Sequence, residues 1–166
     1  MILGLTPFTA FHTLISLIAI VAGVPVALGF FTGRPSAFWT GLFLGTAIAT
    51  SVTGFLFPLH GITPAIMVGI IALIIFAGAL LGRYAFHLTG LWRQVYVLGV
   101  IANLYLLVFV AIVQAFAKFG FLKALAPTQT EVPFTATQGI VLIGFIIIAI
   151  AAARASRHGP PAGAHG

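Results

Sequence analysis

Long apolar blocks separated by short polar turns dominate the chain. The longest block follows Arg93 and reaches Phe116 without another charged residue. A helix rises about 1.5 Å per residue, so a block of this length can cross the roughly 30 Å hydrocarbon layer of a bilayer. Four other blocks are similarly apolar. The pattern predicts membrane-spanning helices over residues 8–31, 38–57, 65–81, 92–116 and 138–153.

Proline and threonine mark the ends of several predicted helices. Thr6 followed by Pro7 predicts an N-cap and a first helical position, where the N–H that proline lacks is not needed. Thr63 followed by Pro64 repeats this signature before the third helix. Pro25 lies inside the first helix and is expected to kink it, whereas Pro58 is expected to end the second.

The segments outside these helices differ in character. Residues 117–137 are expected to form a linker at the membrane surface, with a moderately amphipathic stretch that Pro127 ends. Residues 154–166 contain mainly Arg, His, Gly, Pro and Ala, which predicts a disordered tail. Residues 1–153 are therefore expected to form one all-α domain, a transmembrane helical bundle with a four-helix core and a fifth, C-terminal helix outside it.

Composition agrees with a membrane location. Hydrophobic residues make up 61% of the chain and charged residues only 5%, whereas soluble domains carry about a quarter charged residues. Such a chain cannot cover itself with a polar surface, so the lipid bilayer is its expected environment. The net charge of +6 does not predict a nucleic-acid partner, because the basic residues are scattered between apolar blocks and form no patch.

Residues that commonly carry catalysis are scarce. The chain has no cysteine, and Glu131 is its only carboxylate, which excludes thiol nucleophiles and paired-carboxylate chemistry within one chain. Neither a phosphate-binding Walker loop nor a GxSxG nucleophile motif is present. The sequence therefore favours a protein that is not an enzyme.

The basic residues predict the orientation in the membrane. With five spans, lysines and arginines fall on opposite sides, Lys118 and Lys123 on one and Arg34, Arg83, Arg93, Arg154 and Arg157 on the other. Because cytoplasmic loops carry the excess of positive charge, the N-terminus is expected outside and the C-terminus in the cytoplasm.

Small residues recur along the second predicted helix. Gly41, Gly45 and Ala49, the small-residue stripe, are spaced four residues apart, and Thr53 continues the series. Small side chains let two helices approach closely, which is a main source of association energy in lipid. The stripe therefore predicts a helix contact, either within the chain or between chains.

Polar residues inside the apolar blocks are candidates for a site. His12 and His60 are expected near the outer surface and are candidate axial ligands for haem b or a transition metal. A structural, hydrogen-bonding role for His12 and a solvated position for His60 are the alternatives. A polar pocket is expected to hold Thr53, Asn103 and Gln114. Asn103, near the midplane, can line a pathway or bond neighbouring helices.

Several segments resemble small, uncharacterised multi-pass inner-membrane proteins of proteobacteria. They are FHTLISLIAIVAG, WTGLFLGTAIATSVTGFLFPLHG, RYAFHLTGLWRQVYVLGVIANLYLLVFVAIVQAF and LKALAPTQ, and the resemblance covers about residues 8–140. It implies a bacterial inner-membrane location and no particular activity. More distantly, the chain resembles helical-bundle membrane proteins with one histidine early in the first span and another after the second, positions that His12 and His60 occupy.

Three functions are consistent with these observations. The first is a non-catalytic accessory or assembling component, with a homo-oligomer or a membrane-complex partner. The second is a small b-type cytochrome or quinone-linked redox protein, for which a Soret band lost in His12→Ala is the test. The third is a small-solute transporter with Asn103 in the path, for which flux should be lost in Asn103→Leu.

Overall fold

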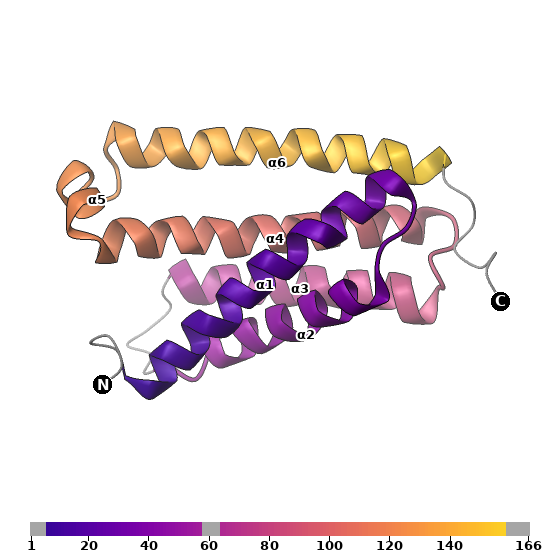
Figure 1. The fold of residues 1–166 in the computed structure, drawn as a ribbon, viewed down its shortest axis with the longest axis horizontal. Helices are drawn as coiled ribbons and strands as arrows, with labels where there is room; N and C mark the ends of the chain where they lie inside the picture. The colour runs from indigo at the N-terminus through magenta and orange to yellow at the C-terminus, as the bar shows by residue number, and fades with distance from the viewer. Residues whose placement is uncertain (1–5, 58–63, 159–166) are drawn as a thin grey trace.

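The computed structural model describes residues 6–57 and 64–158, and helices account for most of them. Five of these helices are long and apolar enough to cross a bilayer. The chain is therefore an all-α, multi-pass membrane protein, as the hydrophobic pattern predicted. In order, the helices are α1 (Pro7–Thr32), α2 (Ala37–Gly54), α3 (Pro64–Leu80), α4 (Leu91–Lys118), the short α5 (Gly120–Leu125) and α6 (Val132–His158) (Figure 1).

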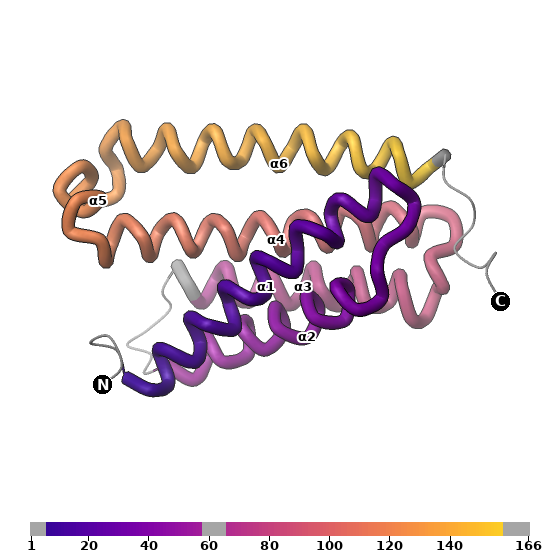
Figure 2. Tube along the Cα trace, in the orientation of Figure 1, coloured from indigo at the N-terminus to yellow at the C-terminus, as the bar shows by residue number. Residues whose placement is uncertain are grey.

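Helix α4 is the centre of the bundle. It packs against α1, α3 and α6, while α2 packs against α1 and α3 (Figure 1). Helix α6 runs beside α4 and leaves most of its surface uncovered, which agrees with the predicted fifth helix outside a four-helix core (Figure 2). Helices α1 and α6 contact each other as well as α4.

The two ends of the bundle carry different basic residues. Helix α1 begins and α4 ends at one end, called here the lysine end because it holds Lys118 and Lys123 (Figure 1). Helix α1 ends and α4 begins at the other, the arginine end, which holds the five arginines Arg34, Arg83, Arg93, Arg154 and Arg157.

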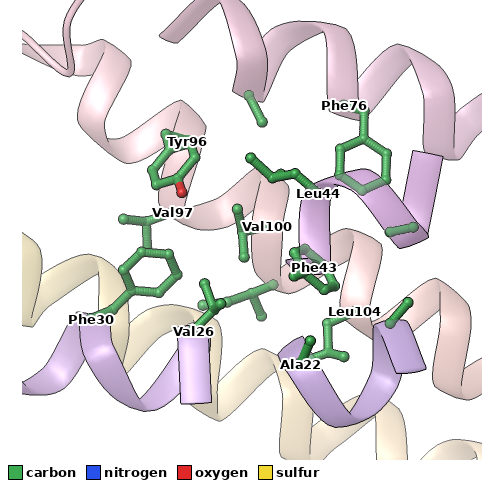
Figure 3. Close-up of a cluster of buried hydrophobic side chains, with 14 of the residues drawn as sticks. Ala22, Val26, Phe30, Phe43, Leu44, Phe76, Tyr96, Val97, Val100 and Leu104 are labelled. Carbon is green, nitrogen blue, oxygen red and sulfur yellow. The ribbon is translucent and has the colours of Figure 1, made fainter. Parts of the chain in front are cut away.

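Buried side chains from α1 to α4 form the core (Figure 3). Val26 from α1, Phe43 from α2 and Val100 from α4 have no exposed surface, and Phe76 of α3 packs beside Phe43. Helix α6 adds Ala152 to this cluster. Because lipid is as apolar as these side chains, close packing stabilises the core more than exclusion from water does.

The start of α1 confirms the predicted cap. The Thr6 hydroxyl accepts a hydrogen bond from the Thr9 N–H (3.2 Å), and Pro7 occupies the first helical position. The helix continues through Pro25 and ends at Thr32, and the capping Gly33 has a φ of +68°, in the left-handed region that glycine adopts without strain.

The prediction for the last helix was too short at both ends. Helix α6 begins six residues before residue 138, because the Glu131 carbonyl accepts hydrogen bonds from the N–H groups of Phe134 and Thr135 (both 3.1 Å). Pro133 then lies in the first turn, where no N–H is needed. Residues 132–137 of the predicted linker are therefore helical.

Polar contacts to α4 hold the last turn of α6. The Gln94 side-chain amide donates to the Ser156 hydroxyl (3.0 Å), and the Arg93 guanidinium donates to the Ser156 carbonyl (3.1 Å). Residues 154–158 of the predicted disordered tail therefore continue the helix. Among the other boundaries, α2 ends at Gly54, and a π-helical turn, η1 (Leu81–Ala85), prolongs α3.

Candidate functional site

His12 and Thr53 meet at the lysine end, where α1 begins and α2 ends. The His12 Nδ1 and the Thr53 Oγ1 lie 2.8 Å apart, and the Thr53 hydroxyl donates its one proton to the Ala49 carbonyl of its own helix (2.7 Å). With that proton on the Ala49 carbonyl, Nδ1–H is the group that donates to Thr53, and a neutral imidazole in this tautomer carries its lone pair on Nε2. The contact joins two helices and sets the tautomer of the ring.

Aromatic rings surround this histidine. The imidazole and Phe57 rings meet edge to face, with centroids 5.1 Å apart and planes at 87°, and the Phe8 ring lies 4.8 Å from that of Phe57. The half-buried side chain can thus present Nε2, the atom that a haem iron or another metal would use.

The second predicted ligand, His60, lies outside the described residues. Within residues 6–57 and 64–158, no group of three or more His, Cys, Asp or Glu side chains is placed to hold a metal ion. Binding of haem b or a metal by His12 and His60 therefore stays a prediction.

The three residues of the predicted polar pocket have different surroundings. Thr53 binds His12, and the buried Asn103 (1% exposed) donates from Nδ2 to the Gly99 carbonyl of its own helix (3.0 Å). The Gln114 side chain is exposed. No hydrogen bond within the described part of the chain joins Thr53, Asn103 and Gln114, and the Asn103 Oδ1 has no partner there.

The small-residue stripe starts on an outward face of α2. A Cβ built on Gly41 or Gly45 would meet no atom within 4 Å, whereas Thr53 faces α1. Four residues advance a helix by about 400°, so residues spaced by four turn about 40° at each step. The stripe therefore winds from an open surface at Gly41 to an internal contact at Thr53.

At the arginine end, Arg83 and Tyr96 form a pair that sequence reasoning missed. The Arg83 Nη1 donates to the Tyr96 hydroxyl (3.3 Å), and the guanidinium carbon lies 5.4 Å from the Tyr96 ring centroid and 5.7 Å from that of Tyr84. These distances fit cation–π contacts. Tyr96 is only 2% exposed, so a buried side chain holds the Arg83 guanidinium in position.

The π-helical turn η1 brings Arg83 to this place. A Cβ on Gly82 would lie 2.9 Å from the Trp92 carbonyl oxygen, so only glycine lets the turn pack directly on the α4 backbone. The Leu88 N–H then donates to the Gly82 carbonyl (2.8 Å), and the Phe86 and Trp92 rings stack 3.9 Å apart. The connection between α3 and α4 is thus closely held.

Glu131, the one carboxylate, organises the loop before α6. Desolvation favours its neutral form, but hydrogen bonds from the Thr128 hydroxyl (2.8 Å) and from the N–H groups of Thr128 and Thr130 (both 3.1 Å) outweigh this effect. Together they hold the pKa of Glu131 below its usual value. The ionised carboxylate therefore orders the turn that starts α6.

The comparisons with known proteins identify no relative of this chain. No family model, no curated protein and no solved structure matches this chain. The resemblance to small bacterial inner-membrane proteins stays an expectation, and the residues themselves must carry the functional argument. They establish an apolar protein with five helices suited to cross a membrane.

Proposed function

We propose that this chain is a non-catalytic accessory component of a bacterial inner membrane that assembles through one face of α2. The observation that carries the proposal is the outward position of Gly41 and Gly45, which no described residue covers. We call this surface the open α2 face and define it by Phe38, Gly41, Gly45, Val52 and Leu56.

The open α2 face has the shape of a helix-docking surface. Its four helical residues fall within an arc of about 60° around the helix axis, at about 100° per residue, and Leu56 follows just beyond the end of α2 at Gly54. Phe38 is 68% exposed, Val52 and Leu56 are exposed as well, and the glycines leave a depression between these bulky side chains. A second helix can approach the glycines closely and gain packing contacts there.

The partner that we propose is a second copy of this chain. The same face on two copies can form a two-fold symmetric contact. Helix α2 carries no ionised side chain, so no like charges would oppose each other across this contact. Close backbone approach at the glycines also permits Cα–H···O contacts between the copies.

Energy transfer between labelled copies in liposomes tests this assembly. The chain has no cysteine, so one dye can be placed at Ala124→Cys, on the exposed surface of α5. We expect the wild type to associate and Gly45→Ile to weaken association about tenfold, the effect of losing 1–2 kcal/mol of helix packing. The matched control is Gly144→Ile on α6, where a Cβ also meets no atom within 4 Å.

Two results would contradict self-assembly through α2. One is a wild type that stays monomeric at the highest protein-to-lipid ratio. The other is an equal loss of association in Gly45→Ile and Gly144→Ile, because a side chain at Gly144, where a Cβ meets no atom within 4 Å, should leave the α2 contact intact.

We also propose that the arginine end faces the cytoplasm, with the N-terminus outside. The charge difference between the two ends supports this orientation. In intact bacteria, an impermeant maleimide should label Ala124→Cys at the lysine end, and should label Ser36→Cys at the arginine end only after permeabilisation. Labelling in the reverse order would contradict the proposed orientation.

A further inference from the structure

The outer face of α3 carries an apolar hollow at the arginine end. It is shallow and widely open, with a volume of about 570 Å³, and it is lined by Ala77, Leu80, Leu81, Tyr84 and Ala85. The small side chains of Ala77 and Ala85 leave the space, and Leu81 and Tyr84 are exposed beside it. The hollow belongs to α3 and the π-helical turn, so it is separate from the open α2 face.

A cation stands next to this hollow. The Arg83 guanidinium carbon lies 5.7 Å from the ring centroid of Tyr84, which lines the hollow, and its other contacts are with Tyr96. The Tyr96 hydroxyl is the one hydrogen-bond acceptor that the described residues offer to Arg83. Since a guanidinium has five N–H donors, most of them remain available to a ligand.

Within residues 6–57 and 64–158, no carboxylate lies near Arg83. Glu131 is the only acidic residue in the sequence, and its side chain binds the Thr128–Thr130 turn at the lysine end, on the opposite side of the bundle. An anion from another molecule can therefore pair with Arg83. At the surface of a bilayer the abundant anions are lipid phosphates, which a guanidinium binds in a bidentate manner.

We propose that this place binds an anionic phospholipid, with the phosphate on Arg83 and an acyl chain in the hollow on α3. The apolar lining selects a ligand with a hydrocarbon tail, and the cation selects an anionic head. A zwitterionic lipid also has a phosphate, but its ammonium group would lie close to the positive charges of the arginine end. A free phosphate ion would use Arg83 but not the hollow.

Native mass spectrometry of the detergent-solubilised full chain tests the site. The protein is titrated with phosphatidylglycerol and phosphatidylcholine of identical acyl chains. The wild type should retain the anionic lipid about fivefold more strongly, the effect of one basic residue at a membrane surface. Arg83→Gln should abolish this preference. Arg34→Gln, which removes an exposed arginine from the same end, should leave it intact.

A second pair of variants tests the hollow independently of charge. Ala77→Phe fills the hollow from an exposed position on α3 and should weaken retention of both lipids several-fold. Ala136→Phe, at an exposed position on α6, should weaken neither. Because Ala77 is not a core residue, this variant remains informative even where Arg83→Gln unfolds the protein.

Several results would overturn the lipid site. Equal loss of preference in Arg34→Gln and Arg83→Gln would mean diffuse attraction to the arginine end. Unchanged lipid retention in Ala77→Phe would show that no acyl chain occupies the hollow. Displacement of the lipid by inorganic phosphate would show that the site binds the head group alone. None of these results bears on self-assembly through α2, so the two proposals fail separately.

Discussion

Replacing Phe43 by alanine is expected to lower the free energy of unfolding by about 2–3 kcal/mol. The ring has no exposed surface and packs beside Phe76 of α3, and its Cε2 lies 3.0 Å from the Cβ position of Gly23 in α1. Alanine would leave a cavity where three helices meet. Because the unfolded chain stays in lipid, mainly the packing term is lost, which places the estimate at or below the lower end of the range for phenylalanine-to-alanine changes in soluble cores.

A lipid-facing phenylalanine provides the matched control for Phe43. Phe11 on α1 is 53% exposed, and alanine there should change stability by less than about 0.5 kcal/mol. Reversible unfolding in mixed micelles, followed by circular dichroism, gives both values. Equal losses for Phe43→Ala and Phe11→Ala would mean that Phe43 does not lie in a packed core.

Replacing Gly99 by leucine is expected to cost about 3 kcal/mol, because it forces α3 and α4 apart. A Cβ on Gly99 would lie 3.0 Å from the Cβ of Ala79 and 3.5 Å from the Ile75 carbonyl oxygen. The Ala79 methyl group has no rotamer that moves it away, so the helix backbones must shift. Alanine at position 99 requires a smaller shift and should cost about 1 kcal/mol.

The control for this helix contact is Gly144→Leu on α6. A Cβ there meets no atom within 4 Å, so the substitution should leave the unfolding free energy nearly unchanged. The same micelle unfolding assay compares the three variants. A Gly99→Leu protein as stable as the wild type would rule out the close α3–α4 contact.

The sequence was sufficient to predict the helices long enough to span a membrane and the level at which several polar groups lie along the bundle. Hydropathy predicts spans well because lipid offers no partner to an exposed backbone N–H or carbonyl, which leaves the helix as the available structure for an apolar block. Depth follows from position along a helix, and His12, which was expected near the outer end of the first span, meets Thr53 at one end of the bundle.

The direction in which a side chain points around the helix axis was harder to predict than its position along the helix. Gln114 was expected near Thr53, but its side chain is exposed, because which face of α4 is covered depends on how its neighbours pack. The small-residue stripe shows the same limit, since residues spaced by four do not stay on one face. Two glycines of the stripe face outward, whereas Thr53 faces α1.

Local turn chemistry explains the remaining differences. The start of α6 at Val132 was missed because residues 117–137 were assigned to the linker, whereas the Glu131 carbonyl accepts the first helical hydrogen bonds. The pairing of Arg83 with Tyr96 depends on the π-helical turn η1, whose wider hydrogen-bonded rings displace the residues that follow it. No simple hydropathy pattern marks such a turn.

The segregation of arginines to one end has a consequence for the lifetime of the topology. Turning the molecule over would carry five guanidinium groups through hydrocarbon, each at a cost of at least about 3 kcal/mol at the bilayer centre. The barrier to inversion therefore exceeds thermal energy many times. Whichever way the chain is threaded during synthesis, it keeps that direction until it is degraded.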